Sequence, residues 1–452
     1  MSDLFEGAEG SASGGDRPVR RQGMGSARLR RPVRDEVTLQ VCDLDSLLDD
    51  EHPARLIWAY AAKVDLSDLE AAVKSREGGA GMPQTSLHLL LALWLYAMTR
   101  GVGSARELAR LCQSEAAFRW LCGGVSVNHR MLSEFRAREG ERVGRLLTQH
   151  VAGLSLAGLI SLDEIAQDGI RVRANAGAKS FRRRKTLESE LAKAQALVTR
   201  LSQEEDDDPG GPGRRRKAAQ ERAAKEREAR IEAALAALGE AETLREKRLK
   251  TNRAKEQKAK APRASTTDAE ARVMKMADGG FRPAYNVQFA SLPENGVVVA
   301  VSCGCVGDRG LAEPMAQTIE ANYGRRPDVH LVDGGYMAKD DIEAASKAGT
   351  KLYAPATRSK SGVGRYEPRA HDSRAIAEWR ERMNSPQGAE TYKRRSRCEL
   401  VHARFRNLGL DHLTVRGRKN VETCMRWFAL AANILTEARL RAQAAWREQA
   451  AA

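Results

Sequence analysis

Hydrophobic residues recur at intervals of three and four through the first third of the chain, a spacing typical of amphipathic helices. The pattern runs from about Val37 to Leu159. Within it we expect three short helices, at residues 104–112, 114–121 and 128–139. The pattern therefore predicts a helical N-terminal domain over residues 35–160. Its three short helices are compatible with helix-turn-helix DNA binding, and equally with an ordinary small bundle.

The periodicity changes to the alternation typical of strands at Leu162. The pattern then predicts a strand around Asp168, a hairpin over 284–292 and 296–306, a helix over 312–323, a strand over 329–332, a helix over 339–347 and a strand over 351–354. Three antiparallel strands followed by strand–helix crossovers is the order of the ribonuclease H-like fold. We predict this mixed-sheet domain over residues 161–180 and 263–440, with a C-terminal tail over 441–452.

A long stretch rich in Ala, Glu, Lys and Arg interrupts the sheet domain over residues 181–262. Its part from Arg214 to Lys260 holds 16 Lys and Arg against 8 Asp and Glu, a net charge of +8. Two long helices joined near residues 204–213 would form an antiparallel, coiled-coil-like hairpin. Its apolar seam would consist of Leu187, Leu191, Leu197 and Leu201 on one arm and Ile231, Leu235, Leu238 and Leu249 on the other. The insertion is either a solvated spacer or an arm that contacts DNA or another subunit.

Composition and charge narrow the choice of partner. The 452 residues carry 75 Lys and Arg against 60 Asp and Glu, a net charge of +15, which favours a polyanion and above all nucleic acid. Residues 1–34, rich in Gly, Ser and Arg, predict a disordered basic arm. The seven cysteines are scattered, and the longest apolar run, Leu87 to Met98, is too short to span a bilayer. We therefore expect a cytoplasmic protein without membrane contact.

Two aspartates stand at the ends of predicted strands. Asp168 lies in the first strand and is followed by Gly169, and Asp333 directly follows the buried strand at 329–332. An isolated Asp-Gly pair is most often a turn. If the first and fourth strands are neighbours, however, the two carboxylates converge and can share divalent cations.

A third carboxylate follows from helix geometry. Four polar residues fall within an arc of roughly 60° on a continuous helix over residues 391–406: Tyr392, Arg395, Glu399 and Arg406. Val401, Phe405 and Leu408 project from the opposite side. The polar stripe is either a solvated face or the side of the helix that meets an active site. The two aspartates favour the second interpretation.

These motifs resemble those of DDE transposases from bacterial insertion-sequence elements, in the branch whose third carboxylate lies in a Tyr-x2-Arg-x3-Glu-x6-Lys signature. Residues 168–176 are similar to the first-aspartate motif and 332–336 to the second. Other similar blocks extend the resemblance over most of the chain, at residues 45–55, 118–124, 266–272 and 280–288. Two residues depart from the motifs: Arg406 stands at the signature Lys, and Gly334 replaces the usual Ala.

The resemblance implies that Asp168, Asp333 and Glu399 are the catalytic residues and bind two Mg²⁺ ions, for which Mn²⁺ can substitute. Water attacks first and the freed 3′-OH second, without a covalent protein intermediate. The resemblance further implies that Tyr392, Arg395 and Arg406 contact DNA near the cleaved end. The partners would be double-stranded DNA, at the element ends and at the target, and further copies of the chain in a homo-oligomer.

Three alternatives stay open at this point. A repurposed transposase would bind DNA without catalysis, and a metal-dependent nuclease would cut without rejoining. A coiled-coil scaffold rests only on the insertion. Asp308 and Glu313 resemble supporting residues of the site, and His330 stands where a buried strand residue is expected.

Overall fold

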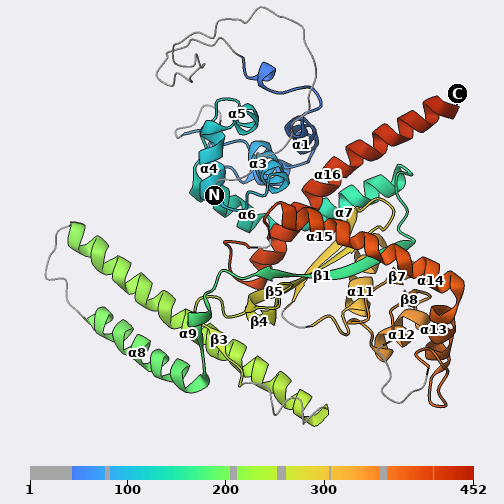
Figure 1. Cartoon of the computed structure of the whole chain (residues 1–452). Coiled ribbons are helices and arrows are strands. Elements are labelled where there is room, and N and C mark those ends of the chain that lie inside the picture. The colour runs from blue at the N-terminus through green and yellow to red at the C-terminus, as the bar shows by residue number, and fades with distance from the viewer. Residues whose placement is uncertain are drawn as a thin grey trace, which may run out of the picture. The chain divides into compact units, whose positions relative to one another are not determined.

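The computed structural model describes residues 43–76, 82–203, 211–251, 261–304, 307–356, 364–410 and 412–451. The basic arm predicted over residues 1–34 lies outside this part of the chain. Residues 44–452 belong to one structural unit, drawn in Figure 1. None of the described helices is both long and apolar enough to cross a membrane.

The N-terminal part of the unit is helical, as predicted. Its elements are η1 (Asp45–Leu47), α1 (Pro53–Ala61), α2 (Ser67–Ala71), α3 (Leu87–Thr99), α4 (Ala105–Ser114), α5 (Ala116–Cys122), α6 (His129–Arg138) and α7 (Gly140–Leu156). Helix α3 is buried around its whole circumference, because apolar side chains occupy every face from Leu89 to Met98. Ser104 and Asn128 begin α4 and α6 by accepting hydrogen bonds from backbone N–H groups of the first turn. The three predicted short helices correspond to α4, α5 and α6.

A mixed sheet follows, and its strand order confirms the predicted ribonuclease H-like arrangement. The strands are β1 (Glu164–Arg173), β4 (Arg272–Lys275), β5 (Phe281–Ser291), β6 (Val298–Gly304), β7 (Val329–Leu331) and β8 (Lys351–Tyr353). They are ordered β4-β5-β1-β7-β8, and β6 also pairs with β5. Strand β1 is antiparallel to β5 and parallel to β7. Strand β4 was not predicted.

Helices cover both sides of this sheet (Figure 1). They are α11 (Ala312–Tyr323), α12 (Lys339–Lys347), α13 (Arg374–Asn384), α14 (Pro386–Lys393), η3 (Arg394–Cys398), α15 (Glu399–Asn407) and α16 (Arg418–Ala451). Side chains at alternate positions of β5 decide which helix lies on which side. The ring of Phe289 packs against Phe405 of α15 and Phe428 of α16, so these helices lie on the side that Phe289 faces.

Helix α16 joins the helical part to the sheet. Two adjacent aromatic residues point in different directions: Trp427 meets Phe135 of α6, with ring centroids 6.3 Å apart, while Phe428 meets Phe289 of the sheet. The buried Asn433 side chain also bonds to both the N–H and the carbonyl of Val298 in β6, each at 2.8 Å. One hydrophobic core therefore spans both parts. The helix runs on through residue 441, where we predicted a separate tail.

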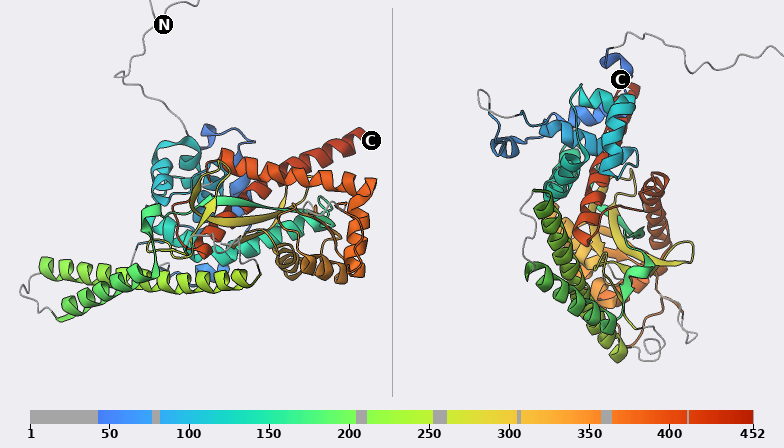
Figure 2. Two further views of the ribbon diagram at one scale, coloured as in Figure 1. Left: turned by 60° about the horizontal axis from the view of Figure 1, so that its bottom comes forward. Right: turned by 90° about the vertical axis from the view of Figure 1, so that its left-hand side faces the viewer.

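The insertion forms a helical hairpin on a short ribbon of its own. Strands β2 (Phe181–Arg182) and β3 (Ala264–Ser265) pair antiparallel, so the two ends of the insertion meet. Between them lie α8 (Arg184–Gln203) and α9 (Gly211–Thr251), side by side in Figure 2. The seam buries Leu187, Ala194, Ile231, Ala234 and Leu238. Arg184, at the start of α8, pairs with Glu242 in the last third of α9, which confirms the antiparallel hairpin.

Candidate active site

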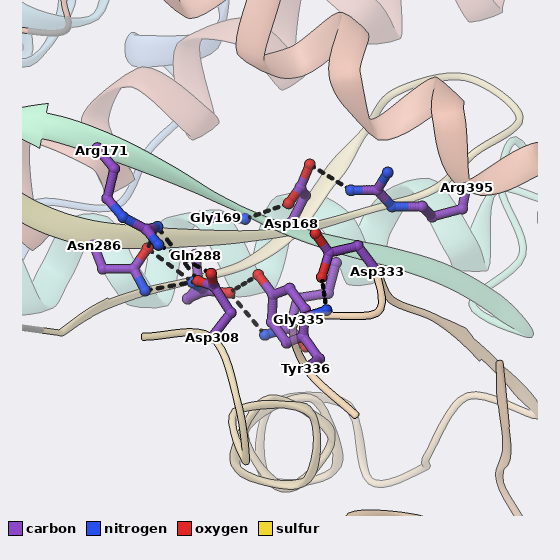
Figure 3. Close-up of polar contacts among 11 residues, drawn as sticks. Asp168, Gly169, Arg171, Asn286, Gln288, Asp308, Asp333, Gly335, Tyr336 and Arg395 are labelled. Atoms are coloured by element: carbon purple, nitrogen blue, oxygen red, sulfur yellow. Dashed lines mark hydrogen bonds and ion pairs between the residues drawn. The ribbon is translucent and has the colours of Figure 1, made fainter. Parts of the chain in front are cut away.

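The pairing of β1 with β7 brings the two predicted aspartates together. Ala166 of β1 lies opposite Leu331 of β7. Asp168 and Asp333 each follow this pair by two residues. They therefore lie at the same height along two adjacent backbone segments, and adjacent strands are about 4.8 Å apart. Figure 3 shows the two carboxylates next to each other. Burial raises the pKa of Asp168, and the charge of Asp333 raises it further.

Glycines next to both aspartates allow the carboxylates to fold back on the backbone. The N–H of Gly169 donates to Asp168 Oδ1 at 2.8 Å, and the N–H of Gly335 donates to Asp333 Oδ1 at 2.6 Å. A Cβ atom on Gly335 would lie only 2.8 Å from that same Asp333 oxygen. The second motif therefore requires glycine at this position to keep the side chain of Asp333 in place.

Arg395 lies between two of the three predicted catalytic carboxylates. Its Nη2 donates to Asp168 Oδ2 at 2.7 Å, and its Nη1 is 3.5 Å from Glu399 Oε1. The side chains of Arg395 and Asp168 are only 15% and 16% exposed, which strengthens their attraction. Tyr392 is close as well, since the charges of Arg395 and Asp333 both act on its pKa, which burial raises to about 12. A guanidinium thus occupies the position between carboxylates where a cation is expected.

The helix that carries these residues is interrupted, so the prediction of one continuous polar stripe over residues 391–406 is wrong. The 3₁₀ segment η3 separates α14 from α15. Residues three apart eclipse in a 3₁₀-helix, which aligns Cys398 with Arg395 and turns Glu399 about 120° away from them. The Glu399 side chain is 64% exposed and reaches Asp168 only through Arg395. Arg406 is exposed.

Two buried residues that the sequence analysis did not select lie beside Asp168 instead. Cys398 Sγ is 3.9 Å and His402 Nδ1 is 3.7 Å from Asp168 Oδ2. Burial lowers the pKa of His402 to about 4, so its ring is neutral at pH 7. The spacing of Arg395, Cys398, His402 and Phe405 by three, four and three residues was the available signal for this inward face.

The donor set suits a hard divalent cation in part. Asp168 and Asp333 present carboxylate oxygens at one place, the ligands that Mg²⁺ prefers. Within the described ranges, no group of three His, Cys, Asp or Glu side chains is arranged to hold a metal ion. Two of the three predicted ligands are therefore together, and the third, Glu399, is not beside them.

A second polar feature lies between α4, α6 and the segment that precedes α16. It is a cavity of about 600 Å³ lined by Arg106, His129, Arg136 and Arg416, with Asn175 from the end of the first-aspartate motif. No carboxylate is among its lining residues in the described part of the chain. This cavity is therefore electropositive, and we call it the basic cavity.

Comparison with protein families gives two matches. Residues 253–434 match the transposase DDE domain, and residues 42–138 match the transposase domain DUF772. The chain therefore carries the DDE domain of a transposase. The transposase gave no match among curated proteins or solved structures. Its DDE domain implies phosphodiester hydrolysis and strand transfer, as the three predicted carboxylates had suggested.

The matched DDE region of the transposase begins near the end of the insertion. It contains Asp333 and Glu399 but not Asp168, which precedes it by 85 residues. The pairing of β1 with β7 brings Asp168, which lies outside the matched region, beside Asp333. The two predicted aspartates thus come from opposite sides of the helical hairpin in the sequence.

Proposed function

We propose that this transposase binds the ends of a bacterial insertion sequence, nicks them by hydrolysis and joins the freed 3′-OH to target DNA. The observation that carries the proposal is the parallel register of β1 and β7, which sets Asp168 in the middle of β1 beside Asp333, two residues past the end of β7. The Tyr392, Arg395 and Glu399 spacing supports assignment to the Tyr-Arg-Glu-Lys branch.

Divalent metal ions fit the proposal because two carboxylates already meet. Asp168 and Asp333 would hold Mg²⁺, or Mn²⁺ in its place, and Glu399 would complete the set. Two such ions, when bound, supply activation of the attacking oxygen and stabilisation of the leaving 3′ oxygen. Glu399 joins the aspartates only if Arg395 releases it and the η3 segment turns. We infer that this rearrangement accompanies DNA binding.

Arg395 and Tyr392 would bind and orient DNA rather than take part in bond breaking. Arg395 Nε has no hydrogen-bond partner among the described residues but is buried, so this donor would become available to a phosphate once the η3 segment turns. The raised pKa of Tyr392 keeps its hydroxyl protonated at neutral pH, which makes it a hydrogen-bond donor and a poor nucleophile. Arg406, which is exposed about three turns beyond Arg395, would contact the same DNA strand.

The path of the DNA is inferred from charge. The basic cavity faces solvent with the exposed side chains of Arg106 and Arg416, and none of the described residues that line it is a carboxylate. We assign it to the phosphate backbone of an element end. The hairpin of α8 and α9 would act as a clamp on DNA or on a second subunit, since cleaving and joining two ends requires at least two active sites.

The test is cleavage of a labelled element end in Mg²⁺. Asp168→Asn, Asp333→Asn and Glu399→Gln are each expected to abolish nicking and joining. Binding of the end should stay within a few-fold of wild type, because phosphate contacts dominate affinity. Glu390→Gln is the matched control, since Glu390 is exposed and pairs only with Lys393 among the described residues.

Each outcome of this test has a separate meaning. Near wild-type cleavage by any of the three variants would remove that residue from the proposed set. A wild-type protein that nicks DNA but never joins a pre-cleaved 3′ end would be a nuclease. Binding without either reaction would indicate a repurposed, silent transposase.

A further inference from the structure

Buried polar side chains form a connected network on the side of the sheet opposite Asp168 (Figure 3). Because side chains alternate along a strand, Gln167, Gly169 and Arg171 all face this side. The antiparallel register places Gln288 of β5 opposite Gly169 and Asn286 opposite Arg171. The network therefore lies directly beneath the candidate active site.

Asp308 accepts hydrogen bonds from three side chains of this network. Its carboxylate accepts hydrogen bonds from Arg171 Nη2 at 3.0 Å, from Asn286 Nδ2 at 2.8 Å and from Gln288 Nε2 at 3.1 Å. Burial by itself would raise the pKa of Asp308, but the hydrogen bonds from Arg171 and Asn286 outweigh burial and lower it. Asp308 is therefore ionised and acts only as an acceptor.

An acceptor at this position fixes the orientation of the Gln288 amide. Because Nε2 of Gln288 points to Asp308, its Oε1 points the other way, where it accepts from Gln167 Nε2 at 3.0 Å and from the hydroxyl of Tyr336. Gln167 Oε1 in turn is 3.0 Å from Nε2 of the buried His330. Burial lowers the pKa of His330 to about 3, so its ring is neutral. Its Nε2–H donates to Gln167 Oε1, and this is the last hydrogen bond of the series.

Tyr336 belongs to the turn that holds the second aspartate. Its N–H donates to the carbonyl of Asp333 at 3.2 Å, and its own carbonyl accepts from the N–H of Gly310 at 3.4 Å. The ring is buried, with 1% exposed. The hydroxyl bond to Gln288 is thus the side-chain anchor that joins the Asp333 turn to the sheet.

We propose that Asp308 is a positioning residue for Asp333. Its charge orients Gln288, Gln288 anchors Tyr336, and Tyr336 holds the turn from which Asp333 reaches toward Asp168. Asp308 acts through these residues and contacts neither DNA nor the reacting atoms. The proposal rests on the proposed catalytic role of Asp333.

Asn at position 308 keeps the shape but can offer an NH₂ group as well as an oxygen, so the Gln288 amide is no longer forced into one orientation. Asp308→Asn and Tyr336→Phe break the two ends of the same connection. Each should lower single-turnover cleavage by about 10- to 100-fold, the range for residues that support metal ligands. End-DNA affinity should stay within a few-fold of wild type, because neither residue reaches the phosphates.

The double variant is the decisive measurement. If the two residues act through one connection, Asp308→Asn with Tyr336→Phe loses no more activity than the worse single variant. Asp278→Asn is the control, because Asp278 is an exposed carboxylate paired with Arg282 on another turn. If Asp308→Asn fails to fold, Tyr336→Phe alone decides, since it removes one oxygen atom.

A readout without catalysis separates this proposal from the proposed function. Mg²⁺ should raise the melting temperature of wild type and of Asp278→Asn, and should raise that of Asp308→Asn and Asp333→Asn clearly less. Losses that multiply in the double variant, or equal losses of binding and cleavage, would overturn the positioning role. If wild type cleaves nothing, the proposed function fails. An Mg²⁺ shift in Asp308→Asn equal to that of wild type, or none in wild type, would overturn the positioning role as well.

Discussion

Gly169 separates Asp168 from the network beneath it, and a methyl group there tests how tightly the two are packed. A Cβ atom at this position would lie 2.4 Å from Gln288 Nε2, 2.8 Å from Asn286 Oδ1 and 2.9 Å from Asp308 Oδ1. Cβ atoms in proteins essentially never lie within 3.0 Å of a non-bonded nitrogen or oxygen atom. Gly169→Ala must therefore displace at least one of these side chains and break a buried hydrogen bond.

The expected cost combines two effects. Overpacking a buried site costs about 1–3 kcal/mol, and each lost hydrogen bond adds about 1 kcal/mol, for a total near 2–4 kcal/mol. Unfolding a unit of roughly 400 residues, at about 2.1 cal/mol/K per residue, converts this to a melting temperature about 2–5 °C lower. Cleavage should fall about tenfold or more, because a backbone shift that relieves the clash moves the residue-169 N–H that holds the Asp168 carboxylate.

Differential scanning calorimetry and single-turnover cleavage measure the two effects. Gly177→Ala is the matched control from the same segment, because a Cβ on Gly177 would meet nothing within 4 Å. Gly177 also has an ordinary backbone φ of −80°. A Gly169→Ala protein with the melting temperature and cleavage rate of Gly177→Ala would refute the packing argument.

Two further predictions concern DNA binding. Binding to an element end should weaken steeply with salt. Deleting residues 1–34, or combining Arg106→Ala with Arg416→Ala, should flatten the slope of log affinity against log salt concentration by about 0.9 per lost phosphate contact. A slope unchanged in gel shifts would mean that the altered residues do not contact DNA. Replacing residues 183–263 by a short Gly/Ser linker should leave a folded, monodisperse protein, because β2 and β3 already hold the ends together and loop closure changes little. We expect this protein to bind ends poorly or to fail to pair them in gel-shift and light-scattering assays, whereas full activity would rule out the clamp.

The sequence predicts the fold well where the pattern is local. Helix α11 spans Ala312–Tyr323 as predicted, because its apolar positions have helical spacing and Gly324 ends it with a positive φ. The strand order follows from the order of strands and crossovers along the chain. Strand β4 escapes prediction because its four residues, Arg272–Lys275, are half-buried at most and each of its faces mixes one charged with one apolar residue.

The site is predictable only in part. Asp333 does follow a strand end as predicted, whereas Asp168 lies in the middle of β1. The orientation of Glu399 depends on where a helix tightens into a 3₁₀ turn. That choice is made by Cys398 and His402 packing against Asp168, a contact between residues more than 200 positions apart. Asp308 resembles a supporting residue in the sequence, but its hydrogen bonds to Arg171, Asn286 and Gln288 become visible only once β1 and β5 are assembled around it.

Helix α16 limits how transposases of this design can acquire new DNA ends. The match to DUF772 ends at residue 138. The matched helices nevertheless pack against Trp427 of α16 through Phe135, and they share one hydrophobic core with the sheet. A recombination event that exchanged residues 42–138 between two such genes would leave the buried face of α16 against foreign side chains. New end specificity is therefore expected to arise through point substitutions on exposed helix surfaces and not through domain shuffling.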